Sequence, residues 1–240
     1  MISISAGHWG KGTGANGHLD EGVENIKVAK RLTEILKSAK IVTHYIQDTV
    51  NKSANANVNW LVSKHNATDR DIDVQVHFNS SAGTYNKGIG IEVLIYDEKY
   101  LPIANKICAA VSKVSGLKNR GGKVRKDLGF LRNTKKPAFL IEVCFVNDSV
   151  DAAIYRRDFE KISQAIASEL ATAVGKKLKP STTSTVDDKP SAAVLNGRKL
   201  VRKAVQEGVF DAKIHTDARI NSYSAETLLK YALTYIDRTS

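Results

Sequence analysis

The sequence predicts an α/β protein with a twisted, mostly parallel sheet, helices on both faces, and a small helical module at its C-terminal end. Short apolar strands alternate with amphipathic helices along the first 175 residues, and this order produces parallel strands joined by crossover helices. The run AFLIEVCF at 138–145 is almost wholly apolar, as a central strand covered on both faces is. In IDVQVHFN at 72–79, apolar and polar residues alternate with the period of a strand.

Each element is expected from its own pattern. Strands are expected where β-branched and aliphatic residues cluster between polar turns, at 2–5, 41–46, 72–79, 89–96 and 138–145. Helices are expected where apolar residues recur every three or four positions, at about 21–39, 56–67, 100–115 and 159–178. Gly116 follows the third helix, where glycine commonly ends one. The segment GHWGKGTGANG after the first strand is expected to be a loop.

The character of the chain changes near residue 176. The segment 176–193 holds two of the four prolines, a Ser/Thr cluster and no apolar periodicity, which is typical of a linker. Two amphipathic helical patterns follow, and the second opens with the capping box SAET. We therefore expect a main domain at 1–175, a linker at 176–193 and a small helical module at 194–240. A module of this size is expected to pack on something or to pair with a second copy, as a homodimer.

The composition is that of an ordinary globular protein, but the charge is unusual. No apolar run approaches the roughly 20 residues of a membrane span, and the start MISISAGHWG lacks the pattern of a signal peptide. Two cysteines are too few for a disulfide framework and fit synthesis in a reducing cytoplasm. The formal net charge of +11 predicts attraction to a polyanion, such as nucleic acid, an anionic membrane or the acidic polymers of a bacterial wall.

Five basic residues crowd one segment, which is expected to be a loop. They are Lys118, Arg120, Lys123, Arg125 and Lys126. No aromatic residues are interleaved with them and no nucleic-acid-binding motif is present, so nucleic acid is not expected as a partner. The alternative to any binding role is a solvated basic face.

Three side chains suited to metal binding fall where predicted strands and helices end. His8 follows the first strand, His77 lies near the end of the third, and Glu21 opens the first long helix. In an open α/β sheet, sites form beyond the carboxyl ends of the strands. Two imidazoles and one carboxylate suit a catalytic zinc ion, which keeps one coordination position open. Each residue alone has a structural alternative, such as a histidine satisfied in the core.

Glu142 stands out because it lies inside the apolar run 138–145. An ionised carboxylate at such a position is costly unless a cation or a mechanism retains it. The alternative is an ion pair with a lysine or arginine. The sequence therefore places a candidate acid/base on the central strand.

Three separated blocks resemble, in order, the zinc-dependent N-acetylmuramoyl-L-alanine amidases (amidase type 3). Residues 7–32 are similar to the opening Gly-His, glycine loop and glutamate of that family, with an asparagine four residues after the glutamate. VQVHFNSSAG is similar to its His-x-Asn segment, and LGFLRNTKKPAFLIEVCFVND to its Leu-Arg-Asn-Thr, Pro-Ala and Glu-x-x-Phe run. The resemblance covers roughly residues 1–174. A catalytic domain joined by a linker to a small module resembles a phage endolysin.

This resemblance implies a bacteriolytic hydrolase that cleaves the amide between N-acetylmuramic acid and L-alanine in peptidoglycan during host cell lysis. It implies His8, Glu21 and His77 as ligands of one zinc ion and Glu142 as the catalytic acid/base. Such a protein is made in the host cytoplasm and acts on the wall after release. Peptidoglycan and its anionic polymers are then the expected partners, and the C-terminal module is expected to bind the wall.

The sequence also departs from the family pattern and leaves alternatives. Ser-Ala-Gly-His replaces the usual Asp-Pro-Gly-His, and Cys144 stands where glycine is common and is expected to narrow the space beside the acid/base. Glu24 competes with Glu21 for the ligand role; Glu21 is favoured because Asn25 and Asp48 then match the family pattern. A nucleophilic role for Cys144 is a further alternative, less favoured than an inert buried thiol.

Three more residues are expected near the reaction. Arg132 is expected to bind the oxyanion or a carboxylate of the stem peptide, with a solvated salt bridge as its alternative. Asn79 and Glu92 are expected to orient the metal ligands. A zinc peptidase or carbohydrate deacylase with the same centre is the main alternative function. A non-catalytic wall- or nucleic-acid-binding protein is another, but it leaves Glu142 unexplained.

Overall fold

The computed structural model of the protein forms two compact units, residues 1–179 and 180–240. It describes residues 1–50, 53–178, 192–212, 215, 216, 220, 227, 228, 231, 234 and 235. Most of the linker expected at 176–193, and most of the helix expected near the C-terminus, lie outside the described residues. No helix within the described ranges is long and apolar enough to cross a membrane.

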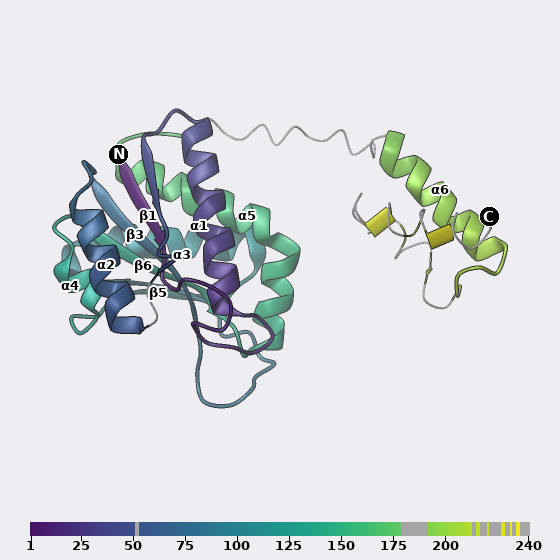
Figure 1. The fold of residues 1–240 in the computed structure, drawn as a ribbon, viewed down its shortest axis with the longest axis horizontal. Coiled ribbons are helices and arrows are strands. Elements are labelled where there is room, and N and C mark those ends of the chain that lie inside the picture. The colour runs from purple at the N-terminus through teal and green to yellow at the C-terminus, as the bar shows by residue number, and fades with distance from the viewer. Residues whose placement is uncertain are drawn as a thin grey trace. The chain divides into compact units, whose positions relative to one another are not determined.

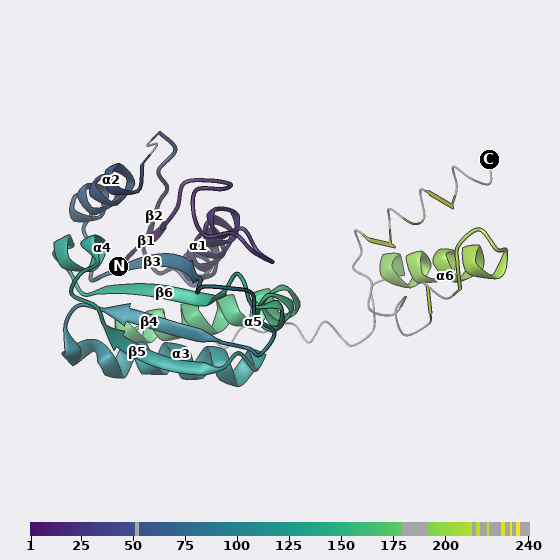
Figure 2. The ribbon, with the colours of Figure 1, turned by 90° about the horizontal axis from the view of Figure 1, so that it is seen from below.

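Six strands form one mixed sheet in the first unit (Figure 1). They are β1 Ile2–Ala6, β2 Thr43–Ile46, β3 Ile72–Asn79, β4 Ile91–Ile95, β5 Asn119–Val124 and β6 Ala138–Phe145. Figure 2 shows them in sheet order, β2-β1-β3-β6-β4-β5. All neighbours are parallel except β4 and β6, which are antiparallel. The prediction of a mostly parallel sheet flanked by helices is confirmed. Because β4 and β5 run in reverse, their first residues lie at the edge where β1, β3 and β6 end.

Helices cover the two faces of the sheet unequally. One face packs on α1 Glu21–Ser38, α3 Leu101–Ser115 and α5 Ser149–Ala173, and this side holds the main apolar core. The other face packs on α2 Ala54–Asn66 and the short α4 Gly129–Asn133, which bury a small cluster around Phe130 and Leu140. Figure 1 shows α2 and α4 on the opposite side of the sheet from α1 and α5. The thinner cover on the second face leaves room there for polar side chains.

Two differences from the sequence prediction have clear causes. The basic segment expected to be a loop instead forms the edge strand β5, which pairs only with β4 among the described strands. Its sequence NRGGKV lacks apolar alternation, because an edge strand needs little apolar surface and commonly carries lysine. Helix α5 begins at Ser149, before the expected residue 159, because Asp148 caps it by accepting from two backbone N–H groups.

The second unit has a small apolar core of its own. Helix α6, Ala192–Gln206, matches the first of the two helical patterns expected there. Its Val201 and Ala204 pack in one cluster with Phe210, Ile220, Leu228 and Tyr235. The Tyr235 hydroxyl donates a hydrogen bond of 2.5 Å to Glu207 Oε2. The described residues of this unit thus hold one another in place.

Candidate metal centre

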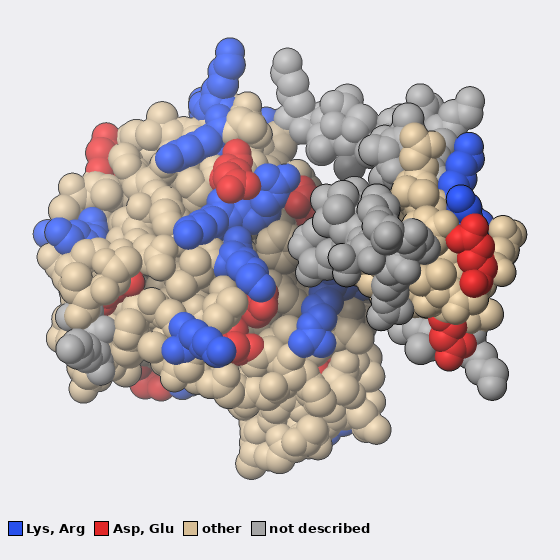
Figure 3. All heavy atoms as spheres, turned by 45° about the vertical axis from the view of Figure 1, so that its right-hand side comes forward, with Lys and Arg blue, Asp and Glu red and all other residues tan. Residues whose placement is uncertain are grey.

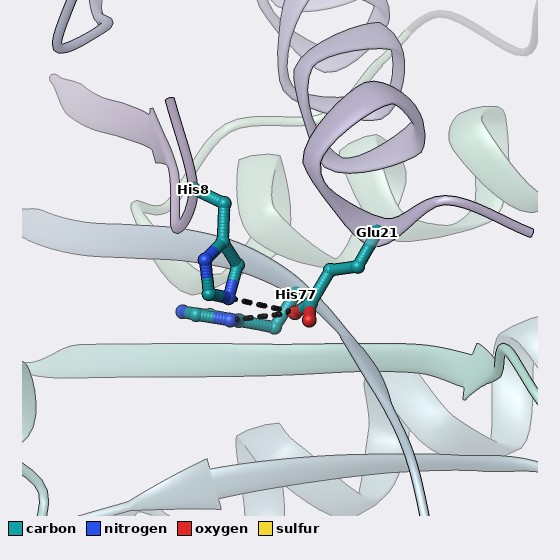
Figure 4. A group of neighbouring side chains, drawn as sticks. All are labelled: His8, Glu21 and His77. Atoms are coloured by element: carbon teal, nitrogen blue, oxygen red, sulfur yellow. Dashed lines mark hydrogen bonds and ion pairs between the residues drawn. The ribbon is translucent and has the colours of Figure 1, made fainter. Parts of the chain in front are cut away.

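Three side chains from separate parts of the chain converge where the parallel strands end (Figure 4). His8 follows β1, His77 belongs to β3, and Glu21 is the first residue of α1. Their potential ligand atoms all lie within 4.8 Å of one another. His8 Nε2 is 3.2 Å and His77 Nδ1 2.9 Å from the same oxygen, Glu21 Oε1. The structure thus brings together the three residues that the sequence predicts as ligands.

The fold around Glu21 holds its carboxylate in one position. Asp20 caps α1 by accepting from the Val23 N–H, so the helix begins at Glu21. Glu21 Oε1 accepts from the Phe78 N–H at 3.0 Å, and Oε2 accepts from the Ala15 N–H at 2.8 Å. These two donors come from β3 and from the glycine loop. The carboxylate therefore joins three segments of chain at the centre.

Glycine makes the close approach of the first strand possible. A Cβ at Gly7 would lie 2.0 Å from His77 Nε2, a distance that no side chain can occupy. The Gly7 carbonyl accepts from the buried Asn57 amide at 2.6 Å, which ties this segment to α2. The two imidazole rings then meet edge to face, with centroids 5.0 Å apart and an interplanar angle of 83°.

The electrostatics suit a bound cation. Burial alone raises the pKa of Glu21, but hydrogen bonds and charge interactions with His77 and His8 outweigh it and leave that pKa well below its usual range. Burial lowers the pKa of His77, although Glu21 opposes this shift. The site therefore offers an ionised carboxylate and a neutral imidazole at neutral pH. Two nitrogen donors and one oxygen donor are a common set for catalytic zinc, so these residues fit the ion.

Glu142 lies next to this group, on the neighbouring strand. It is the register partner of His77 across β3 and β6, and of Glu92 across β6 and β4. Its Oε2 is buried without a hydrogen-bond partner among the described residues, and no lysine or arginine there forms an ion pair with it. Burial, followed by the charges of Glu21 and Glu92, raises the pKa of Glu142 to about 8. The alternative for Glu142, an ion pair with a lysine or arginine, is therefore not formed among the described residues.

Comparison with known proteins gives the family. The family model described as N-acetylmuramoyl-L-alanine amidase matches residues 2–176. The chain belongs to this amidase family. An uncharacterised protein of Clostridium perfringens is 34% identical over 180 residues, which are 73% of this chain and 52% of that protein. The chain spans about half the length of the two C. perfringens relatives that it matches.

Two endolysins are also similar to this amidase-family chain. The endolysin of Bacillus phage SPP1 is 28% identical over 206 residues, which are 80% of this chain and 73% of the endolysin. The solved catalytic domain of the CD27L endolysin targeting Clostridia difficile is 28% identical, with a TM-score of 0.64. That match covers 74% of this chain and 98% of the solved domain. The prediction of an amidase type 3 fold is confirmed.

The structure bears on two alternatives, Glu24 as a metal ligand in place of Glu21 and Cys144 as a nucleophile. Glu24 accepts from the Tyr155 hydroxyl at 2.9 Å and from Lys27 at 2.7 Å, and it is not part of the His8, Glu21 and His77 group. Cys144 is fully buried in the main core, and burial raises the pKa of its thiol well above the usual value. A thiol in this state is protonated at neutral pH and is a poor nucleophile.

The other predicted site residues lie apart from the three ligand atoms. Arg132 is exposed in the last turn of α4, where its Nε donates to Asn133 at 3.4 Å. Asn79 Nδ2 donates to Glu92 Oε1 at 2.8 Å, so these two residues contact each other. Within the described ranges, neither forms a hydrogen bond to the ligand side chains. Their predicted role in orienting ligands therefore stays a prediction.

Sequence reasoning missed two kinds of residue at this site. Gly7 and Asn57 position His77 and the first strand through contacts between segments distant in sequence. Gly7 enters the sequence comparison only as part of the Gly-His block, and no local pattern marks Asn57. Arg120 and Lys123 bind Glu92 beside Glu142, and they were assigned only to a basic loop. The available signal was Glu92, which lies on the predicted strand 89–96. A carboxylate on a buried strand needs a cation nearby.

Replacing Gly7 is expected to disturb the metal centre without disturbing the core. We predict that Gly7→Ala weakens zinc affinity about 10- to 100-fold, the usual cost of displacing a group that orients a ligand, because the new Cβ displaces the His77 imidazole. Gly10→Ala is the matched control, since a Cβ there meets nothing within 4 Å. Zinc titration calorimetry of both variants measures the effect. Equal affinities in the two variants would contradict the predicted role of Gly7.

The pKa of Glu142 predicts how metal-free stability depends on pH. The folded-state pKa of about 8 exceeds the unfolded value of 4.5, so the carboxyl group favours folding at acidic pH, and this stabilisation is lost as pH rises through 8. Each unit of difference is worth about 1.4 kcal/mol. Relative to Glu142→Gln, the wild type should lose on the order of 4 kcal/mol between pH 5 and 8. Urea unfolding of both chelator-treated proteins measures this; parallel pH profiles would refute it.

Proposed function

We propose that this chain hydrolyses the amide bond between N-acetylmuramic acid and L-alanine in bacterial peptidoglycan, using one zinc ion held by His8, Glu21 and His77. The observation that carries this proposal is the convergence of these three side chains beside the buried, unpaired carboxyl group of Glu142. Membership of the amidase family supports the substrate class. The donor set supports the metal.

The chain's own residues have distinct tasks in this reaction. A zinc ion at the centre would supply Lewis acidity toward the amide carbonyl and toward water. Glu21 and the two histidines contribute a single negative charge, so a dication held by them keeps a net positive charge. Glu142 accepts the proton of the attacking water at Oε2 and later delivers a proton to the departing L-alanine amine. Its Oε2 has no other partner among the described residues, which leaves it available for both steps.

The pKa of Glu142 suits such a double role. A group that first takes and then returns a proton works best when its pKa lies near the working pH. Burial among apolar strand residues brings the pKa of this carboxyl group to about 8, whereas Glu21 remains ionised. Carboxyl groups in one site whose pKa values are driven apart commonly divide the acid/base and charge-stabilising roles between them.

We also propose that the protein acts as a phage endolysin on the walls of its host. The similarity to the endolysin of Bacillus phage SPP1 and to the CD27L catalytic domain supports this setting. The protein would be made in the host cytoplasm and would reach the wall after release. The net charge of +11 favours attraction to anionic wall polymers.

Glu142→Gln tests the mechanism directly. The variant should keep its fold and its zinc but lose about 100- to 10,000-fold in rate, because the amide cannot accept the proton of water. His8→Ala and His77→Ala should instead lose zinc, as measured by metal analysis. The assay digests purified peptidoglycan and identifies the released ends. New L-alanine amino groups support the proposal; new sugar amines or peptide ends would indicate the deacylase or peptidase alternative, and a wild-type rate in Glu142→Gln would reject the mechanism.

The C-terminal unit is proposed to hold the enzyme on its wall. Residues 194–240 carry eight Lys and Arg against five Asp and Glu, and tethering raises local substrate concentration without adding a catalytic contact. Residues 1–179 should hydrolyse small soluble muropeptides at the rate of the full chain but clear whole walls more slowly. The match to the solved CD27L catalytic domain covers 98% of that domain, which was solved without a C-terminal unit. This supports the expectation that residues 1–179 fold on their own.

A fusion of residues 190–240 to a fluorescent carrier supplies the second measurement, and it should decorate susceptible cells. Ultracentrifugation of the same fusion tests the rival function, pairing with a second copy. A truncated enzyme that clears walls as fast as the full chain, with a fusion that stays off the cells, would exclude the targeting role.

A further inference from the structure

A pair of cations lies beside Glu142 on the side away from the metal centre. Glu92 is the register partner of Glu142 across β4 and β6 and is almost fully buried. Its Oε2 accepts from Arg120 Nε at 2.6 Å and from Lys123 Nζ, while Oε1 accepts from Asn79. Two positive charges thus meet one carboxylate. The cluster keeps a surplus positive charge next to the proposed acid/base.

An irregularity in β5 places both cations on the same face of the sheet. Residues three positions apart in a regular strand point to opposite faces. Between Arg120 and Lys123, Gly121 has a φ of +73°, and the register with β4 shifts. A glycine in this conformation is typical of a bulge that redirects side chains. A Cβ at Gly122 would lie 2.6 Å from Ala104 Cβ, so this glycine lets the bulged strand pack closely on α3.

The Arg120 guanidinium is held rigidly while part of it stays available. Its carbon lies 5.1 Å from the centroid of the Phe145 ring, and only its Nε is used by Glu92. Neither terminal nitrogen has an acceptor among the described residues, and the side chain is 28% exposed. A planar guanidinium with two free NH₂ groups and a fixed orientation is suited to bidentate binding of a carboxylate.

We propose that Arg120, assisted by Lys123, binds a carboxylate of the substrate's stem peptide and makes the enzyme prefer stems whose second residue carries a free carboxylate. This inference rests on the proposed function, because it takes the scissile amide to lie between the metal centre and Glu142. The carboxyl group of N-acetylmuramic acid is consumed in that amide, so the remaining carboxylates of the substrate belong to the peptide.

The spacing of the strands agrees with this assignment. Adjacent strands lie about 4.8 Å apart, so β5 is roughly 10 Å from the β6 position of Glu142. One residue of extended peptide spans about 3.5 Å. The second stem residue, with the length of its own side chain added, therefore reaches the Arg120 terminal nitrogens. Of the five cations in the basic run, Arg120 and Lys123 thus have a structural reason to meet substrate. The described side-chain hydrogen bond of Arg132, by contrast, goes to its neighbour Asn133.

The test compares two soluble muropeptides that differ only in whether the second stem residue carries a carboxylate or a carboxamide. Wild-type enzyme should favour the carboxylate substrate about 10- to 100-fold in kcat/KM, the usual worth of a charge-assisted pair. Arg120→Met should lower this preference to less than about threefold by slowing the carboxylate substrate alone. Arg120→Lys should restore part of the preference. Lys126→Met, which removes an exposed cation from the far end of the same run, should retain all of it.

The same variants distinguish substrate binding by Arg120 from a purely structural role of Arg120. If Arg120→Met slows both substrates equally, Arg120 acts only by supporting Glu92, and the inference is overturned. An NMR titration with L-alanyl-D-glutamate and L-alanyl-D-isoglutamine, which differ in the carboxylate that stays free in a stem peptide, measures binding independently of cleavage. A preference for the acidic dipeptide that disappears in Arg120→Met supports the inference, even if the protein cleaves neither muropeptide. Failure to cleave would then reject the proposed function but not the inference. Equal binding of the two dipeptides, or tighter binding of inorganic phosphate at Arg120, would overturn the inference.

Discussion

The carboxylate of Glu21 is the interaction on which the rest of the site depends. It accepts from backbone N–H groups of β3 and of the glycine loop, and it faces both histidines. An ionised carboxylate so deeply buried is stable only because these donors and the start of α1, with its positive dipole end, surround it. Any rearrangement of β1, β3 or α1 would leave this charge unpaired. The position of one side chain thus constrains three segments of the fold.

The unequal faces of the sheet explain where chemistry is possible. The face under α1, α3 and α5 is filled with apolar side chains. On the opposite face, β3 presents His77, β6 presents Glu142 and β4 presents Glu92 in one row across three strands. Because β4 runs antiparallel to β6, two carboxylates become direct neighbours, which is unfavourable unless one is neutralised. Arg120 and Lys123 neutralise Glu92, and Glu142 is left with its pKa raised.

The parts of this arrangement that could be predicted from sequence are those with a local cause. Strands 72–79 and 138–145 were predicted with their observed bounds, because their apolar patterns reflect burial directly. His8, Glu21 and His77 were predicted to meet because His8 follows a strand, His77 lies near the end of one and Glu21 opens a helix. Strand β5 was missed because a glycine-rich, basic edge strand has no apolar signal. Gly7 leaves room for the His77 ring, and Arg120 donates a hydrogen bond to Glu92. Both relations join segments that are distant in sequence, so they arise only in the folded chain.

The net charge of the chain has two different consequences, and they act over different distances. On the face in Figure 3, Lys and Arg side chains are spread among Asp and Glu side chains and do not form one continuous patch. A distributed charge attracts an anionic wall only weakly beyond the Debye length of about 8 Å at physiological salt. Selection among substrates must therefore come from cations fixed at contact distance. Arg120 meets that requirement because Glu92 and Phe145 hold it in one orientation, whereas an exposed lysine on a flexible stem has no comparable constraint.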